Sequence, residues 1–164
     1  MLWIRKGAEP RWLAEYRSAA GARFDDLSAD HKEQLRGLLV AEQRGVCCYC
    51  MSRIEALPSS TKIEHWASQS VHPNRALIYA NLLASCKGGE GNPPGAQHCD
   101  TRKASASITL DPTQPDLLKT MRYLPSGHIE ARDDLQDEID HVLGLNITQL
   151  TRARANAVHG FAEF

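Results

Sequence analysis

Four cysteines with metal-ligand spacing lie in the middle of the chain. Cys47 and Cys50 form a C-x-x-C pair, a spacing that brings two thiolates onto one tetrahedral ion at about 2.3 Å. Twelve residues separate Cys86 from Cys99, and they include the Gly- and Pro-rich segment 87–95, which must loop out if both cysteines bind the same ion. The four sulfurs therefore predict a structural zinc site that closes a loop-rich segment.

Neighbouring residues leave the ligand set open. His98 precedes Cys99 and could replace one cysteine, while Cys48 could compete with Cys47. A thiol redox pair is the alternative chemistry for C-x-x-C, but the thioredoxin-like alternation of strands and helices does not surround it. We therefore expect zinc.

Polar residues suited to hydrolysis lie between the cysteine groups. His65 is the candidate general base, because an imidazole with a pKa near ~6.5 accepts a proton at neutral pH. Asp100 and Glu64 offer carboxylate oxygens to Mg²⁺ or Mn²⁺. Asn81 is expected to orient His65 or its loop. A base, together with a cation that offsets phosphate charge, predicts phosphodiester hydrolysis.

Other roles remain open for several of these residues. Arg102 and Lys103 follow Asp100 and are candidates for phosphate contacts. Asp100 could instead cap the helix it begins, and Asn81 could only stabilise a turn.

Helical patterns precede this segment. Pro10 opens a short predicted helix over residues 11–17. Ser28 can cap a second helix that ends at Gly45. The apolar stripe of the second helix consists of Leu35, Leu38 and Leu39.

The central and C-terminal patterns mix strands and helices. Alternation over residues 61–66 predicts a strand, and a helix can begin at Asp100. Residues 121–131 predict a hairpin around a Pro-Ser-Gly turn, and two helices are expected on either side of Gly144. Their apolar faces are Leu135, Ile139, Val142 and Leu143 in the first, and Ile147, Leu150, Ala153, Ala157 and Val158 in the second.

These elements predict an α+β fold in one domain. Residues 1–45 supply N-terminal helices, residues 46–110 a zinc-bound core, and residues 111–164 the hairpin and C-terminal helices. A chain of 164 residues with 42% hydrophobic content is long enough to bury one core.

Charge and hydropathy limit the partners that the sequence favours. The formal net charge is −1, so any nucleic-acid affinity must be local. Residues 61–105 do lean basic, with five basic residues against three acidic ones. The sequence contains no apolar run of about 20 residues and no signal-peptide pattern, so we expect a cytoplasmic protein without membrane contact.

The order and spacing of the polar residues resemble the HNH nucleases. In that family a ββα-metal fold presents an acid-histidine pair on a strand, an Asn-Leu in a loop, and an Asn, Asp or His on a helix, often enclosed by two cysteine pairs. A Glu in the acid position departs from the usual Asp, so the resemblance leaves open whether Glu64 or His98 binds the cation. The corresponding residues here are Glu64-His65, Asn81-Leu82 and Asp100, with Lys103 three positions further on.

Further segments carry a closer resemblance, namely Ile4-Arg5-Lys6, Cys-x-Tyr-Cys-Met, Tyr79-x-Asn-Leu-Leu, His98-Cys99-Asp100 and Tyr123 to Ile129. Over most of its length the chain is similar to the PtuB-type HNH proteins of Septu and some retron defence systems. The resemblance implies a bacterial metal-dependent DNA endonuclease, an anti-phage effector that acts with a PtuA-like ABC-type ATPase. A retron reverse transcriptase with its DNA is a further partner that it allows. The alternative is a non-cleaving HNH-fold module that binds nucleic acid or the ATPase.

Overall fold

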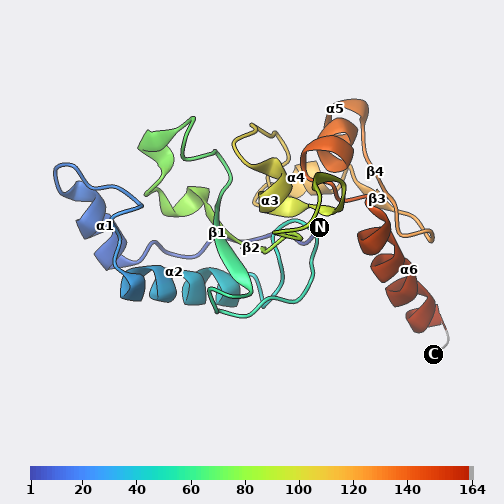
Figure 1. Ribbon diagram of the computed structural model, residues 1–164, viewed down its shortest axis with the longest axis horizontal. Helices are drawn as coiled ribbons and strands as arrows, with labels where there is room; N and C mark the ends of the chain where they lie inside the picture. Colours follow the sequence, from blue (N-terminus) through green and yellow to red (C-terminus); the bar gives the residue numbers. More distant parts are fainter. Residues whose placement is uncertain (163–164) are drawn as a thin grey trace.

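Short helices and two small antiparallel sheets make up the part of the chain that the computed structural model describes, residues 1–162 with side chains to residue 160 (Figure 1). The protein is therefore of the α+β class, as predicted. In chain order, the helices and strands are α1 (Arg11–Ser18), α2 (Ala29–Glu42), β1 (Thr61–His65), β2 (Leu82–Cys86), α3 (Cys99–Lys103), α4 (Pro115–Leu118), β3 (Arg122–Tyr123), β4 (Ile129–Glu130), α5 (Asp133–Asp137) and α6 (Thr148–Ala162). Short turns of other helix types are η1 (Pro73–Arg75), η2 (Tyr79–Asn81), η3 (Pro94–Ala96) and the π-helical η4 (Glu138–Val142).

Both predicted N-terminal helices are confirmed. Pro10 is the N-cap of α1, and the Ser28 hydroxyl caps α2 by accepting the His31 N–H at 3.1 Å. Leu35 and Leu39 are fully buried, as expected, but Leu38 is 43% exposed, so its place in the apolar stripe was predicted wrongly. The core-facing stripe of α2 is thus narrower than its sequence suggests.

The centre of the molecule is a strand-strand-helix unit. β1 pairs antiparallel with β2, with His65 opposite Leu82, and α2 and α3 pack against the pair. We did not predict β2, because its first four residues are all buried and no polar alternation marks the strand. The buried Gln43 amide at the end of α2 binds both backbone groups of Ala84, which ties α2 to β2.

The predicted hairpin and C-terminal helices also form. Arg122 pairs with Glu130 across the hairpin, and Gly127 in its turn has φ +81°, where an added Cβ would lie 1.9 Å from the Thr151 carbonyl oxygen. Among the described side chains of α6, only Leu150 and Thr151 are buried; Ala153 and Ala157 are exposed, and Val158 is 44% exposed. The apolar face predicted for the whole helix is therefore wrong beyond its first turns, and α6 projects from the body in Figure 1. No helix among the described residues is both long and apolar enough to span a membrane.

Candidate metal centre and active site

The four predicted cysteine ligands come together in one cluster. The Sγ atoms of Cys47, Cys50, Cys86 and Cys99 all lie within 4.8 Å of one another. Sulfurs at about 2.3 Å from a tetrahedral ion are about 3.8 Å apart. The Cys47–Cys99 and Cys50–Cys86 sulfur pairs are 3.8 and 3.7 Å apart. The cluster has the residue types and spacing to hold a structural metal such as zinc.

Three separate parts of the fold supply these ligands. Cys47 and Cys50 lie in the turn after α2, Cys86 ends β2, and Cys99 begins α3. The segment between Cys86 and Cys99 does loop out. The two ends of this loop meet at a hydrogen bond of 2.9 Å from the His98 N–H to the Gly88 carbonyl. A bound ion would therefore join α2, β2 and α3.

The geometry separates the cluster from the two competing residues. Cys48 is buried, and its backbone N–H binds the Ala84 carbonyl, but its side chain is not part of the converging group. His98 is also buried, with Nδ1 3.2 Å from the Cys99 sulfur and 4.0 Å from the Cys86 sulfur. This places the imidazole beside the sulfurs, where an N–H can donate to a thiolate.

Four thiolates packed together without a cation would repel one another. Burial, followed by the three neighbouring thiols, raises the pKa of Cys99 well above its usual range. A divalent cation reverses this effect, since it stabilises thiolates directly. The donor set therefore suits a soft divalent metal.

A second polar group lies at the end of β1, around the Glu64 carboxyl. Glu64 is 1% exposed; its Oε1 accepts the Tyr49 hydroxyl at 2.7 Å and lies 2.8 Å from the Lys103 ammonium. The Asp100 carboxyl is adjacent to it. Burial, then the nearby Asp100 carboxyl, raises the pKa of Glu64 well above its usual range, while Lys103 opposes the shift. The carboxyl groups of Glu64 and Asp100 thus lie near each other, with the Lys103 ammonium beside Glu64 and the Lys62 ammonium beside Asp100.

Lys103 lies inside the protein rather than on its surface. It is 2% exposed, and its ammonium also donates to the His65 backbone carbonyl at 2.9 Å. This ammonium therefore joins α3 to both Glu64 and His65 on β1. The side chain that was predicted to contact phosphate is thus buried, and its ammonium is bound to groups of the protein.

His65 is held by its backbone and by its ring. Nε2 lies 3.1 Å from the Ala76 carbonyl, which can only accept, so Nε2 carries the proton and Nδ1 of the neutral ring is an acceptor. The Phe24 ring packs edge-on against the imidazole, with 4.4 Å between centroids and planes at 84°. Burial lowers the pKa of His65, an effect that the bond to Ala76 partly offsets. The ring is therefore neutral at pH 7, which is the state that a general base requires.

Asn81 holds the loop that supports His65. Its Oδ1 accepts the Ala67 N–H at 2.8 Å, and its Nδ2 donates to the carbonyls of Ala67 and Arg75 at 3.0 and 3.1 Å. Arg75 precedes Ala76, whose carbonyl binds the imidazole. Of its two predicted roles, Asn81 is thus placed to orient the loop, not to touch the His65 ring.

We expect Asn81→Asp to destabilise the fold. The carboxylate can still accept the Ala67 N–H, but its second oxygen replaces the donor and faces the carbonyls of Ala67 and Arg75. The free energy of unfolding, measured by urea denaturation, should therefore fall by about 2–3 kcal/mol. Asn74→Asp, at an exposed position in η1, is the matched control. Equal stability of the two variants would contradict this role.

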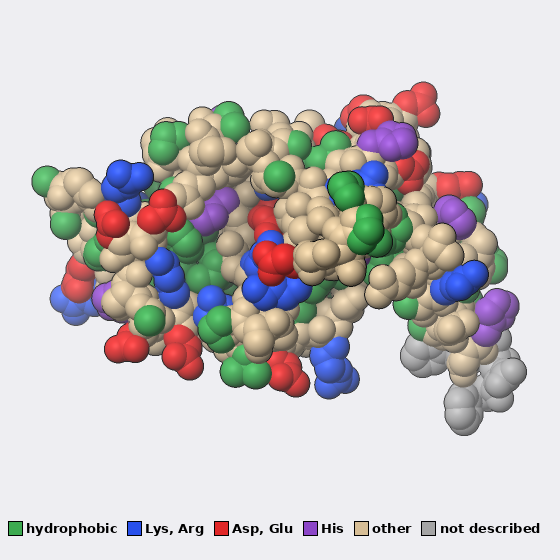
Figure 2. All heavy atoms as spheres, in the orientation of Figure 1, with side chains coloured by type: hydrophobic (Ala, Val, Ile, Leu, Met, Phe, Trp, Pro, Cys, Tyr) green, Lys and Arg blue, Asp and Glu red, His purple; other side chains and the backbone are tan. Residues whose placement is uncertain are grey.

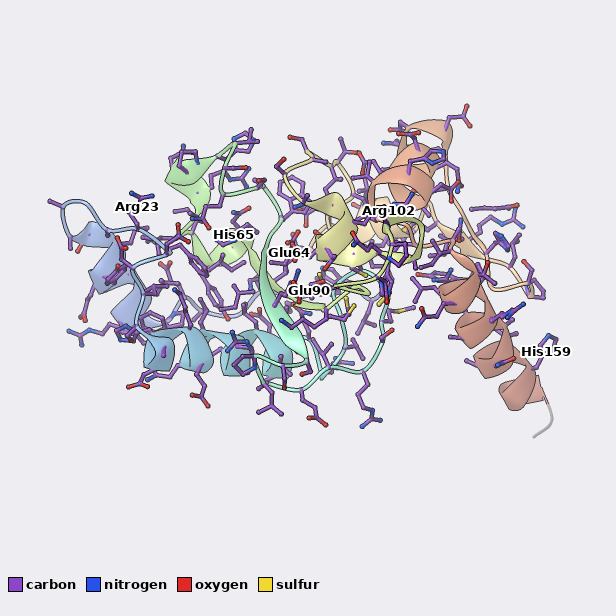
Figure 3. The ribbon with its side chains drawn as sticks, viewed as in Figure 1. Arg23, Glu64, His65, Glu90, Arg102 and His159 are labelled. Atoms are coloured by element: carbon purple, nitrogen blue, oxygen red, sulfur yellow. The ribbon has the colours of Figure 1, made fainter. Side chains whose placement is uncertain are left out.

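A cavity of about 870 Å³ opens beside these groups. Glu64, His65 and Asp100 line one side of it, and the loop between α1 and α2, including Phe24, lines another. Figure 3 shows Glu64 and His65 in succession on β1. The predicted base and both predicted carboxylates therefore share one cavity.

The convergence of the second group is looser than that of the cysteines. Among the described residues, the cysteine cluster is the one group of three or more Cys, His, Asp or Glu side chains with ligand atoms within 4.8 Å. The Asp100 carboxylate lies 3.4 Å from the Lys62 ammonium.

Arg102 faces away from this cavity: it donates to the His141 carbonyl at 3.0 Å and lines a second cavity near the hairpin (Figure 3).

Three contributors to the site were not predicted from the sequence. Tyr49, Phe24 and the Ala76 carbonyl bind Glu64 or His65, and they come from segments far apart along the chain. The "Cys-x-Tyr-Cys" spacing brings Tyr49 near the metal centre, which is the one signal that could have identified it.

Comparison with protein-family models gives no match for this chain, and comparison with curated protein sequences gives no significant match.

Proposed function

We propose that this protein is a metal-dependent HNH-type endonuclease that hydrolyses DNA phosphodiester bonds. The observation that supports it most strongly is His65: its Nε2–H is fixed on the Ala76 carbonyl, and its ring lines the same cavity as Glu64 and Asp100. A neutral imidazole with Nδ1 unprotonated can take the proton of an attacking water. The order strand, strand, helix from β1 to α3 agrees with the ββα arrangement that the sequence resemblance implies.

Two metals have different places in this proposal. Zinc would be held by Cys47, Cys50, Cys86 and Cys99 and would be structural, since four sulfurs leave no open position. Mg²⁺ or Mn²⁺ would be held through oxygen by Asp100, with Glu64 beside it, because adjacent carboxyls suit a hard cation. Such a cation supplies charge compensation at the scissile phosphate.

The residues of the chain divide the remaining work. His65 accepts the proton, while the Ala76 carbonyl and Phe24 keep its ring in place. Lys103 joins Glu64 to the His65 backbone, so it fixes the distance between the carboxylate and the base. Glu64 and His65 are both largely buried, which limits their contact with bulk water.

Cleavage of plasmid DNA in the presence of Mg²⁺ or Mn²⁺ tests this function. Asp100→Asn removes the charge but keeps the shape, and we expect its activation by Mg²⁺ to be weaker by at least about tenfold. Asp116→Asn, a fully exposed carboxylate on α4, should cleave like the parent protein. Equal activation of Asp100→Asn and the parent would remove Asp100 from the metal site.

One observation favours a second function, a non-cleaving module that binds nucleic acid or a protein partner. The ammonium groups of Lys103 and Lys62 already compensate the carboxylates of Glu64 and Asp100. A chain that binds DNA but does not cut it with any divalent metal, alone or with its partner, would support this function.

The sequence resemblance extends the proposal to an anti-phage effector in the bacterial cytoplasm. It would act with a PtuA-like ABC-type ATPase and, in some systems, with a retron reverse transcriptase. Co-purification with such an ATPase, followed by cleavage assays with and without nucleotide, tests the partnership. Cleavage that is unaffected by the ATPase and nucleotide would argue against it.

A further inference from the structure

Arg23 stands out among the charged side chains around the His65 cavity. It lies on the α1–α2 loop, residues 19–28, which forms the wall opposite β1 and α3. Figure 3 labels Arg23 at this loop, with His65, at the end of β1, between it and Glu64 in this view. It is exposed, and it lies outside the motif that predicted the site.

The other arginine of this cavity is already neutralised. Arg17 donates from Nη2 to Glu9 Oε2 at 2.9 Å and from Nη1 to the Leu77 carbonyl at 3.1 Å. The Arg23 guanidinium has no ion pair among residues 1–160. It is thus the basic group on this wall that is available to an anion.

The backbone that carries Arg23 is held on both sides. The Tyr16 hydroxyl donates to the Arg23 carbonyl at 3.0 Å, and the next residue, Phe24, is buried against His65. Asp25 then accepts a hydrogen bond at 3.0 Å from Gln69, which also lines the cavity. The wall is therefore pre-organised, which reduces the entropy lost when a ligand binds there.

The charges that line the cavity would affect the binding of a phosphate. Three carboxylates, Asp25, Glu64 and Asp100, line the cavity against two arginines, and one of these, Arg17, is paired with Glu9. Figure 2 shows basic and acidic side chains interspersed on this face, without one broad basic patch. Attraction of a polyanion must therefore come from single, well-placed basic groups.

We infer that Arg23 is a phosphate-binding residue, and that its guanidinium contacts the backbone of a nucleic-acid strand lying across the cavity, next to the phosphate at His65. This inference rests on the proposed nuclease function. A planar guanidinium suits phosphate oxygens through two parallel hydrogen bonds. The contact reads the backbone and not the bases, so it predicts affinity without sequence preference.

The test is the salt dependence of DNA binding by the full chain. Fluorescence anisotropy with labelled single-stranded and duplex oligonucleotides is measured in a His65→Ala background, which prevents cleavage. Arg23→Gln should lower the slope of log K against log salt by about 0.9 on duplex or 0.7 on single-stranded DNA. Affinity at about 0.1 M salt should fall about fivefold to tenfold, equally for unrelated sequences.

Two further variants separate charge from structure. Arg11→Gln removes a fully exposed arginine that pairs with Glu15 on α1, and it should leave the slope unchanged. Arg23→Lys should restore most of the slope, which a purely structural role would not predict.

The possible outcomes distinguish this inference from the proposed function. If Arg23→Gln has the same salt-dependence slope as Arg11→Gln, and the parent protein cleaves DNA with Mg²⁺, the inference is overturned and the nuclease function is retained. A parent protein that neither binds nor cleaves DNA, alone or with its ATPase, would overturn both.

Discussion

Cys99→Ser should lose zinc and unfold the central unit, whereas Cys48→Ser should keep both zinc and fold. Both cysteines are buried, but only Cys99 belongs to the four-sulfur cluster. Structural zinc in zinc-finger peptides contributes about 10–16 kcal/mol at pH 7, which is comparable with the total stability of a domain, about 5–15 kcal/mol. Loss of one ligand in four should therefore remove most of the stability of this unit.

The position of Cys99 makes the effect of its loss larger. Cys99 has a positive φ of 54°, and its N–H donates to the Leu143 carbonyl at 2.8 Å. A non-glycine residue in this region is held there by its surroundings, at a cost of about 1–3 kcal/mol. Without the metal, α3 loses its link to β2 and to the turn after α2. The buried Lys103 contacts with Glu64 and His65 then remain, and we expect Asp100 to shift relative to β1.

Zinc content by atomic emission and thermal melting by circular dichroism provide the measurements. The parent and Cys48→Ser should contain one zinc per chain, and Cys48→Ser should be less stable by about 1–2 kcal/mol because a hydroxyl is buried. Cys99→Ser should contain none and melt at a much lower temperature. A Cys99→Ser protein with full zinc content and an unchanged melting temperature would show that the cluster has another role.

The sequence was sufficient to predict features in which residue type alone determines the chemistry. The Cys47–Cys50 spacing predicted two members of the cysteine cluster, and Pro10 and Ser28 marked the starts of two helices. These features depend on local spacing or on a cap, so neighbouring residues contain the information.

Features that depend on tertiary packing were not predictable in the same way. β2 is buried on both faces and lacks alternation, and Leu38 lies just outside the face of α2 that the core covers. Phe24 reaches His65 only because the α1–α2 loop folds back over β1. Lys103 follows Asp100 by one helical turn, but its burial depends on Glu64, which lies on another element.

His65→Ala should reduce the rate of DNA cleavage by about 10²–10⁴-fold, because a positioned general base contributes that much to catalysis. Its Nδ1 is the free acceptor of the neutral ring, and the Lys103 ammonium, fixed on Glu64 and on the His65 carbonyl, cannot accept a proton in its place. The assay compares single-turnover cleavage by the parent, His65→Ala and His159→Ala. His159 is an exposed histidine of α6 (Figure 3) and should be dispensable.

The fold of His65→Ala must be checked in the same experiment, because the imidazole packs against Phe24 and loses that contact on truncation. His65 is not a member of the cysteine cluster, so His65→Ala should keep one zinc per chain while it loses activity. A variant with zinc and fold intact but no cleavage separates catalysis from stability. Cleavage that persists at the parental rate in this variant would mean that another group activates the water, and that His65 serves only to anchor β1 to the loop at Ala76.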